Sequence, residues 1–296
     1  MGTAGEFDAA HAQRRFGGVA RLIGEAAFAR VRAAHVVVVG IGGVGSWTVE
    51  ALARSGIGAL TLIDMDHVAE SNVNRQIHAL DSTLGAAKGE VMARRVAEIS
   101  PLCAVTVVDD FVTADNAVAL VPAHGIVVDA IDQPRAKAAM AALCHGRSQP
   151  LVMCGGAGAV TDGLSLRRAD LSHTRGDPLL AAVRARLRRE HGFPREAGRA
   201  FGVEALYFPA ARGGARAGAP ARSTAALAGD GNGEQGGDAL ACAVEPGAPL
   251  ACAGYGSLVT VTAALGLAAA GRALEIAAGM DARAAHGVRP PRDRRA

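Results

Sequence analysis

The chain has 296 residues, of which 50% are hydrophobic and only 3% are aromatic. This length allows one or two domains with a sizeable core, which must be built mainly from Ala, Val, Leu and Ile. The formal net charge is +3, and residues 281–296 alone hold five arginines and two aspartates. The rest of the chain is therefore close to neutral, so overall charge does not identify a partner. The N-terminus is charged and lacks an apolar core, which argues against a secretory signal.

The chain order of expected elements defines the fold class. Residues 1–12 lack periodicity and predict a flexible tail, and residues 14–32 are helical in their second half. Apolar runs predict strands at residues 35–39, 60–63, 104–109, 126–129 and 150–153. Helices are expected at residues 45–55, 86–99, 114–121 and 134–145. This alternation predicts an α/β fold, Rossmann-like, with a mostly parallel sheet and helices on both faces.

A glycine-rich turn follows the first strand, with glycines at Gly40, Gly42, Gly43 and Gly45. Such a turn between a strand and a helix lets backbone N–H groups and the positive helix terminus approach a phosphate. The second strand ends at Asp64, 24 residues after Gly40. At this distance a carboxylate meets a ribose hydroxyl in nucleotide-binding βαβ units. The sequence therefore predicts a nucleotide site.

Polar residues crowd the loop that follows: Asp66, Asn72, Asn74, Arg75, Gln76 and Lys88. A dinucleotide site needs few charges beyond the ribose acid. An ATP site that is cleaved between the α- and β-phosphates needs cations on the triphosphate and a carboxylate for magnesium. Arg75 and Lys88 can supply the cations, and Asp132 can supply the carboxylate. The chain has only two lysines; we expect Lys88 to contact phosphate and Lys137, near Arg135, to lie on a solvated surface.

Several longer stretches resemble a known family. GIGGVGS, DMDHVAESNVNRQIH, GAAKGEVMARRV and VVDAIDQPRAK resemble the adenylation domain shared by ubiquitin-activating enzymes and bacterial sulfur-carrier adenylyltransferases, the ThiF type. RRFGGVARLIGE, VTVVDDFVT, PLVMCGGAGA and DLSHTRGDPLL are similar to one branch, the tRNA threonylcarbamoyladenosine dehydratases. The resemblance covers residues 13–208 and resumes at about residues 252–279.

The resemblance implies a function and a site. The reaction would be ATP-dependent dehydration, a cyclisation, of N6-threonylcarbamoyladenosine beside the anticodon of tRNA, through an acyl-adenylate of the threonyl carboxylate. ATP and Mg²⁺ would be the cofactors, and Asp132 would hold the magnesium. Arg75, Lys88 and Asp132 would be catalytic, and the glycine turn, Asp64 and the polar loop would bind the nucleotide. An N-terminal arginine, Arg15 or Arg21, would reach the triphosphate of the other subunit in a homodimer.

The resemblance and the composition together predict the domain organisation. Residues 13–280 would form a single ThiF-type adenylation domain, interrupted at about residues 209–249 by a low-complexity insertion rich in Ala, Gly, Pro and Ser. Residues 281–296 would be a flexible basic tail. The apolar stretch at residues 258–270 is too short to span a membrane, and we expect a core or subunit-interface helix. A cytoplasmic location fits the free cysteines.

Two other functions remain open at this point. An adenylyltransferase for the C-terminal glycine of a ubiquitin-like sulfur carrier shares the first half-reaction, and a sulfur-relay protein is a candidate partner. A dehydrogenase is the third possibility. The five cysteines form no CxxC pair, so a zinc site is not expected, and no cysteine lies between Cys154 and Cys242 to form a thioester. A helix opening at Asp177 and Pro178 carries arginines that either bind nucleic-acid phosphates or form a solvated face: Arg184, Arg186, Arg188 and Arg189.

Overall fold

The computed structural model describes residues 4–209 and 256–280. Most of the expected insertion, Cys242, Cys252 and the arginines of the basic tail lie outside the described residues. Within the described part, seven strands form one sheet in the order β3-β2-β1-β4-β5-β7-β6. The strands are β1 (His35–Val39), β2 (Ala59–Ile63), β3 (Ala104–Val108), β4 (Ile126–Asp129), β5 (Leu151–Cys154), β6 (Arg167–Asp170) and β7 (Glu204–Tyr207).

All neighbouring strands run parallel except the last pair, in which β6 is antiparallel to β7. The register pairs Val39 of β1 with Ile63 of β2 and with Asp129 of β4. The carboxyl ends of these three strands therefore meet at one edge of the sheet. Ligands of open α/β sheets bind at this edge.

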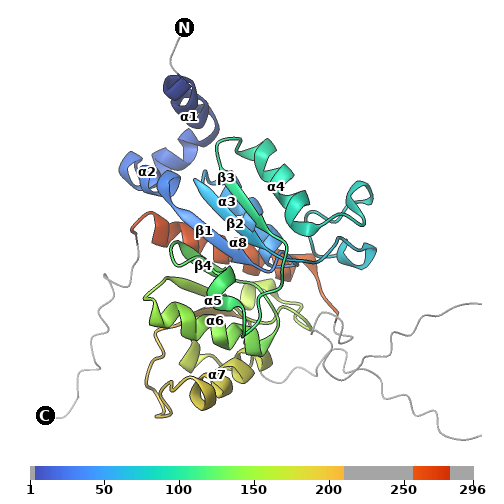
Figure 1. The fold of residues 1–296 in the computed structure, drawn as a ribbon, viewed down its shortest axis with the longest axis vertical. Coiled ribbons are helices and arrows are strands. Elements are labelled where there is room, and N and C mark those ends of the chain that lie inside the picture. The colour runs from blue at the N-terminus through green and yellow to red at the C-terminus, as the bar shows by residue number, and fades with distance from the viewer. Residues whose placement is uncertain (1–3, 210–255, 281–296) are drawn as a thin grey trace, which may run out of the picture.

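Helices cover both faces of the sheet (Figure 1). The helices are α1 (Ala4–Ile23), α2 (Glu25–Ala33), α3 (Gly45–Arg54), α4 (Lys88–Ile99), α5 (Ala117–Leu120), α6 (Pro134–Gly146), α7 (Pro178–Glu190) and α8 (Val259–Ala277). On one face of the sheet, the side chains of Val36 and Val38 pack against helices α2, α3, α4 and α8. On the opposite face, the side chains of Val37 and Val39 pack against helices α5, α6 and α7. The predicted α/β class with a mostly parallel sheet is confirmed.

Most predicted elements agree with the structure to within three residues, but one expectation was wrong and one strand was missed. Helix α1 begins at Ala4, inside the stretch expected to be an irregular tail, and a positive φ of 87° at Gly24 separates it from α2. Strand β6 was not predicted, because its sequence RRAD has no apolar alternation. Its two arginines are exposed, as befits an edge strand, and its register comes from pairing with the buried strand β7.

Helix α8 is long and apolar enough to cross a membrane by length and composition alone. Its contacts in the fold are those of a core helix. Val261, Leu265 and Ala269 are buried in the same cluster as the sheet and α3. Arg272 is buried and its Nε lies 2.6 Å from Glu204 Oε1 on β7. A charged side chain paired with a sheet residue fixes this helix against the sheet.

Candidate nucleotide-binding site

The glycine turn between β1 and α3 is closed so tightly that side chains are excluded from it. A Cβ at Gly45 would lie 1.8 Å from the carbonyl oxygen of Gly40. Gly40 itself has a φ of 86°, and a Cβ there would lie 2.9 Å from Cγ2 of Ile131. Only glycine permits this conformation and this approach. The turn therefore leads directly into the N-terminus of α3 and lies against the turn that follows β4.

Asp64 is fixed beside the glycine turn by two backbone donors. Its Oδ2 accepts a hydrogen bond from the N–H of Ile41 at 2.5 Å, and its Oδ1 accepts one from the N–H of Asp66 at 2.8 Å. The residue is 8% exposed. Burial raises the pKa of the carboxyl, and the positive charge of Lys88 opposes that rise. The position and orientation suit a carboxylate that accepts ribose hydroxyls.

Lys88 opens helix α4 and points back to the loop after β2. Its Nζ lies 2.8 Å from Oδ2 of Asp66, and its backbone N–H donates to the carbonyl oxygen of Asp66 at 2.9 Å. The Lys88 side chain is 6% exposed, whereas that of Asp66 is 53% exposed. The structure thus holds a nearly buried ammonium group close to Asp64, with its partner facing solvent.

Arg75 lies beside the glycine turn. A Cβ at Gly43 would lie 3.3 Å from Cγ of Arg75. The backbone carbonyl oxygen of Arg75 accepts hydrogen bonds from Nε1 of Trp47 at 3.0 Å and from the Thr262 hydroxyl at 3.3 Å. Its Nη1 donates to the carbonyl oxygen of Ser71 at 2.6 Å. Helices α3 and α8 therefore anchor the backbone of this arginine, while its guanidinium group is exposed.

The amide side chains of the loop mainly hold its shape. Asn72 is buried, and its Oδ1 accepts a hydrogen bond from the N–H of Ala69 at 3.1 Å. Asn74 donates to the carbonyl oxygen of Ser257 at 3.1 Å. Gln76 is 5% exposed, and its Oε1 has no hydrogen-bond partner among the described residues. Of the three amides that were expected to bind nucleotide, Gln76 is thus the one with a buried side-chain oxygen that lacks a hydrogen-bond partner among the described residues.

Asp132 lies three residues after the end of β4 and is partly exposed. The nearby Lys137 was expected on a solvated surface, and that expectation was wrong. Its side chain is 0% exposed, and Nζ lies 2.8 Å from Oδ1 of Asp129, which is also 0% exposed. The helical pattern around it gave a usable signal, because the neighbours of Lys137 on α6 are apolar and buried: Ala136, Ala138, Met140, Ala141 and Cys144.

His78 was not singled out from the sequence, although it ends the quoted stretch NRQIH. Its Nε2 lies 2.9 Å from the carbonyl oxygen of Ile41, inside the glycine turn. The residue is 1% exposed. Burial lowers the pKa of the imidazole, so the ring is neutral and donates Nε2–H to this carbonyl oxygen. His78 therefore stabilises the glycine turn through its hydrogen bond to Ile41.

The GGAG stretch after β5 is held by Asp177. The Asp177 Oδ2 accepts a hydrogen bond from the N–H of Gly156 at 2.9 Å, and Oδ1 caps α7 through the N–H of Leu180 at 2.9 Å. A Cβ at Gly155 would lie 2.1 Å from Oδ2. The helix expected to open at Asp177 and Pro178 is confirmed, and the glycines make room for the Asp177 carboxylate.

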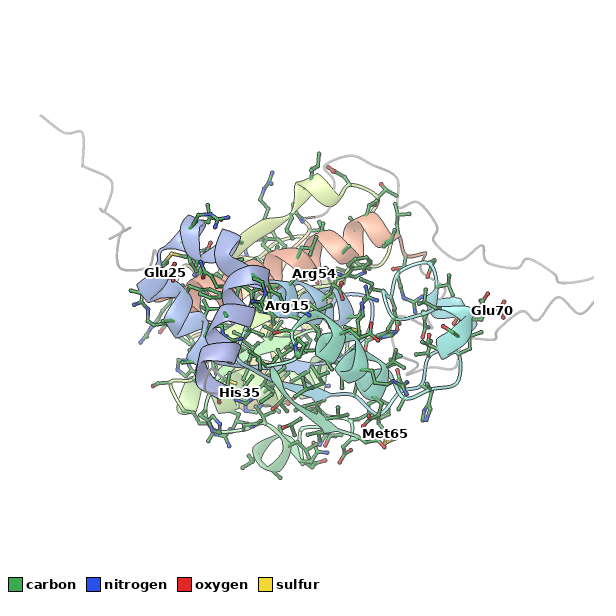
Figure 2. All side chains as sticks on the ribbon, turned by 90° about the horizontal axis from the view of Figure 1, so that it is seen from above. Arg15, Glu25, His35, Arg54, Met65 and Glu70 are labelled. Carbon is green, nitrogen blue, oxygen red and sulfur yellow. The ribbon has the colours of Figure 1, made fainter. Side chains whose placement is uncertain are left out.

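The two N-terminal arginines differ in their surroundings. The Nη1 of Arg15 donates to the last carbonyl oxygens of α4, to Glu98 at 3.1 Å and to Ile99 at 2.7 Å. Arg21 is exposed. In Figure 2 Arg15 lies well apart from Glu70 in the loop after β2. Arg15 is thus engaged with the end of α4 and not with the polar loop of its own chain.

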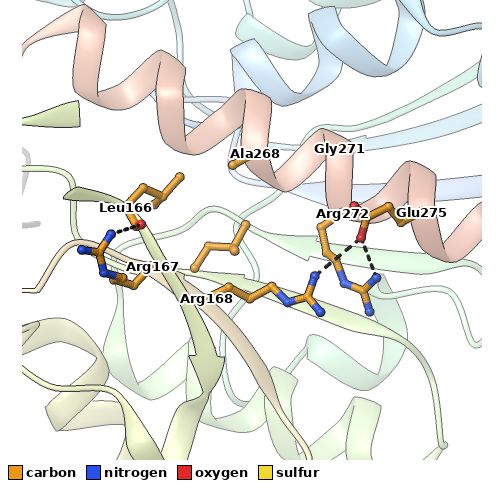
Figure 3. Close-up of a pocket in the computed structure, with 8 residues that line it drawn as sticks. Leu166, Arg167, Arg168, Ala268, Gly271, Arg272 and Glu275 are labelled. Carbon is orange, nitrogen blue, oxygen red and sulfur yellow. Dashed lines mark hydrogen bonds and ion pairs between the residues drawn. The ribbon is translucent and has the colours of Figure 1, made fainter. Parts of the chain in front are cut away.

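A concavity of about 370 Å³ lies between β6 and α8, away from the glycine turn (Figure 3). Three of the side chains that line it form ion pairs with one another: Arg168 lies 3.5 Å and Arg272 lies 2.9 Å from Glu275 Oε2. These contacts fasten α8 to the edge of the sheet. Among the described residues, no group of three or more His, Cys, Asp or Glu side chains is placed to hold a metal ion.

The profile of the ThiF family matches residues 17–288 of this sequence. The chain belongs to the ThiF family. It is 51% identical over 196 residues to the tRNA threonylcarbamoyladenosine dehydratase of Escherichia coli. This alignment covers 66% of this chain and 73% of the relative. It is 35% identical over 119 residues to the molybdopterin-synthase adenylyltransferase of Salmonella typhimurium, 40% of this chain and 48% of that protein.

The fold agrees with a solved member of the family. The crystal structure of the E. coli tRNA N6-threonylcarbamoyladenosine dehydratase in complex with ATP matches this chain with a TM-score of 0.72 at 42% identity. The match covers 92% of this chain and 96% of that chain. The predicted family, and the dehydratase branch within it, are therefore confirmed.

Proposed function

We propose that the chain catalyses the ATP-dependent dehydration of N6-threonylcarbamoyladenosine in tRNA. The observation that carries this proposal is the ammonium of Lys88, held by Asp66 at 2.8 Å next to Asp64 and the glycine turn. This is the arrangement that an adenylating site needs: a ribose acceptor, a phosphate cradle and a buried cation in one place. The similarity to the E. coli dehydratase over most of both chains supports the choice of substrate.

The chemistry follows from the poor reactivity of a carboxylate. Its leaving group would be oxide, so the threonyl carboxylate must first be activated. Attack of the carboxylate oxygen on the α-phosphorus of ATP forms an acyl-adenylate and releases pyrophosphate. The carbamoyl group of the same modification then attacks the acyl carbon, the ring closes, and AMP leaves. Both reacting groups belong to one side chain, so the closure is intramolecular and needs no protein nucleophile.

Each predicted site residue has a role in this scheme. Asp64 would accept the ribose hydroxyls, and the glycine turn with the N-terminus of α3 would cradle phosphate. Arg75 and Lys88 would stabilise the negative charge that develops on the phosphates in the transition state. Gln76, whose Oε1 lacks a hydrogen-bond partner among the described residues, would contact the nucleotide. Asn72 and Asn74 would shape the loop.

Asp132 would hold Mg²⁺ together with phosphate oxygens. The donor chemistry fits, because magnesium prefers a few carboxylate oxygens combined with substrate phosphates and waters. Asp132 is partly exposed at the carboxyl end of β4, the strand next to β1. A bound magnesium ion would supply charge neutralisation at the triphosphate.

The alternative function is activation of the C-terminal glycine of a ubiquitin-like sulfur carrier. The same ATP site would serve its first half-reaction, and the molybdopterin-synthase adenylyltransferase of S. typhimurium matches 40% of this chain. The longer and more identical match to the dehydratase favours the tRNA substrate. We also propose that the chain forms a homodimer in the cytoplasm, in which an N-terminal arginine of each subunit completes the site of the other. A sulfur-relay protein is a further proposed partner.

The decisive experiment is mass analysis of nucleosides after incubation of the protein with ATP, Mg²⁺ and tRNA that carries N6-threonylcarbamoyladenosine. We expect the modified nucleoside to lose the mass of one water, with AMP and pyrophosphate formed in equal amounts. Unchanged nucleoside, together with pyrophosphate exchange that depends on a sulfur carrier ending in Gly-Gly, would establish the alternative instead.

A further inference from the structure

Lys137 makes an unusual set of contacts for a fully buried lysine. Its Nζ lies 2.8 Å from Oδ1 of Asp129, 3.0 Å from the carbonyl oxygen of Ile131 and 3.4 Å from the carbonyl oxygen of Asp129. An ammonium has three donors, and all three are directed at a segment of three residues. That segment ends immediately before Asp132. The contacts therefore tie the first turn of α6 back to the turn that carries Asp132.

The same turn also contacts the glycine turn. Ile131 presents its Cγ2 to Gly40 at a distance that excludes any side chain there, 2.9 Å from a hypothetical Cβ. The backbone N–H of Ile131 donates to Oδ1 of Asp129 at 3.3 Å. Lys137 and Asp129 thus fix Ile131 through its N–H and its carbonyl oxygen at once. A displacement of this residue would move both the glycine turn and Asp132.

A buried ion pair is a costly way to obtain stability alone. Removing two charges from water carries a large desolvation penalty, and well-packed apolar residues of similar volume are often as stabilising. The Lys137–Asp129 pair has a feature that apolar residues cannot replace, because it supplies a donor to the carbonyl oxygen of Ile131 at 3.0 Å. The geometry therefore points to a role in orienting the turn.

We propose that Lys137 is a positioning residue, which holds the turn between β4 and α6 so that Asp132 faces the nucleotide and its magnesium. This inference rests on the proposed ATP site, although not on the identity of the acceptor. Lys137 itself is fully buried, so a nucleotide bound at the glycine turn would not reach it. Its effect should therefore pass through Asp132.

The test uses a variant that removes the pair without leaving a buried charge. Lys137→Met combined with Asp129→Val deletes both charges, and should fold even if Lys137→Met alone does not. The matched control is Arg272→Met with Glu204→Leu, which deletes another buried pair at the amino end of β7. Thermal unfolding first establishes that both proteins fold. The measured quantity is then the dissociation constant for ATP in the presence and absence of Mg²⁺, without tRNA.

We expect the Lys137/Asp129 variant to lose affinity for ATP about tenfold or more when Mg²⁺ is present, and the control variant to keep its affinity. In the background of Asp132→Ala the same replacement should add less than about twofold, because the two residues act in series. The inference would be overturned if the Lys137/Asp129 variant bound ATP with wild-type affinity. It would also be overturned if the double replacement reduced ATP affinity by the same factor in the Asp132→Ala background as in the wild type. Failure of nucleoside conversion by the wild-type protein would instead count against the proposed tRNA substrate.

Discussion

Lys88 and Asp66 form an ion pair at 2.8 Å in which the cation is nearly buried and the carboxylate is half exposed. Of the two partners, the nearly buried ammonium depends on the contact, whereas the half-exposed carboxylate of Asp66 is hydrated without it. A triphosphate arriving at the glycine turn can share the ammonium with Asp66, since an ammonium has three donors. When no nucleotide is bound, the contact with Asp66 keeps a positive charge next to Asp64.

The first prediction concerns this charge. Lys88→Ala should slow adenylation by about 10²-fold or more, the scale for loss of one preorganised charge in a transition state. The variant should still fold, because the Asp66 carboxylate that loses its partner is half exposed and can be hydrated. Pyrophosphate release and thermal unfolding measure the two effects. Arg94→Ala, an exposed arginine on the same helix, is the control; equal rates for both variants would remove Lys88 from the mechanism.

The second prediction concerns pH. Burial lowers the pKa of His78 from the ordinary value of 6.5 for histidine. As the pH falls, the imidazole is therefore protonated in the unfolded chain at a higher pH than in the folded protein. The free energy of unfolding that this residue contributes is lost as the pH falls below about 6.5. The loss is at most about 1.4 kcal/mol per pH unit for one proton. We expect His78→Gln, which cannot ionise, to lose less stability than the wild type between pH 7 and pH 5.5.

Urea unfolding at a series of pH values measures this difference. His191→Gln is the control, because His191 is exposed at the end of α7 and its replacement should keep the wild-type pH profile. Since His78 supports the glycine turn through Ile41, the ATP affinity of the wild type should weaken over the same acid range. Parallel pH profiles for the wild type and His78→Gln would show that His78 does not contribute.

The third prediction concerns the thiols. Burial raises the pKa of Cys103 to about 11 and the pKa values of Cys144 and Cys154 to about 12. Thiolates are therefore scarce at neutral pH, and none of these cysteines suits nucleophilic catalysis. Cys154→Ala should retain turnover, and iodoacetamide should not label the three thiols in the folded protein at pH 8. A chelator of zinc should have no effect. A trapped thioester on any of these cysteines would contradict the scheme.

The sequence predicted the elements that position the site because their signals are local. Four β-branched residues followed by glycines define β1 and its turn, and Asp64 and Asp132 follow strands that were correctly placed. The ligand side of the sheet follows from topology alone. The environments of individual side chains were harder to predict. Lysine is usually a surface residue, and although the apolar neighbours of Lys137 on α6 indicate a buried face, only the pairing with Asp129 on β4 shows how its charge is accommodated there.

Strand β6 was missed for a related reason. The sequence RRAD has little intrinsic strand character, and its pairing with β7 is a long-range contact that no local pattern reveals. The supporting role of His78 likewise depends on Ile41, 37 residues away. The residues of the glycine turn could therefore be identified from the sequence, whereas side chains that contact the turn from distant positions in the sequence could be identified only from the structure.

The fourth prediction tests whether the site is shared between subunits. Arg21 is exposed on α1 and is the better candidate to reach a partner, because Arg15 caps the carbonyl oxygens at the end of α4. Arg21→Ala and Lys88→Ala should each be inactive alone. Mixed in equal amounts, they should recover about a quarter of the wild-type activity, since half of the dimers are mixed and each has one intact site. Recovery should require subunit exchange. An unchanged rate for Arg21→Ala alone would exclude its role.

The last prediction concerns how tRNA is held. The four arginines of α7 are not equivalent: Arg184 donates to the Thr174 hydroxyl, and the Arg188 guanidinium lies 5.2 Å from the ring centroid of Phe201. These two therefore support the fold. Arg186 and Arg189 share Glu190 at the end of the helix, and the Arg189 side chain is 61% exposed. We expect Arg189 to offer its charge to phosphate most readily.

Arg189→Glu should weaken tRNA binding several-fold and reduce the slope of log affinity against log salt by about one, the value for one lost phosphate contact. Arg94→Glu makes the same charge change on α4 and should leave the slope unaltered. Filter binding over a range of salt concentrations measures both proteins, and ATP affinity without tRNA should be normal in each. If the two reversals weaken tRNA binding equally, only net charge matters, and α7 is not the docking surface. If neither does, tRNA is held by another part of the molecule.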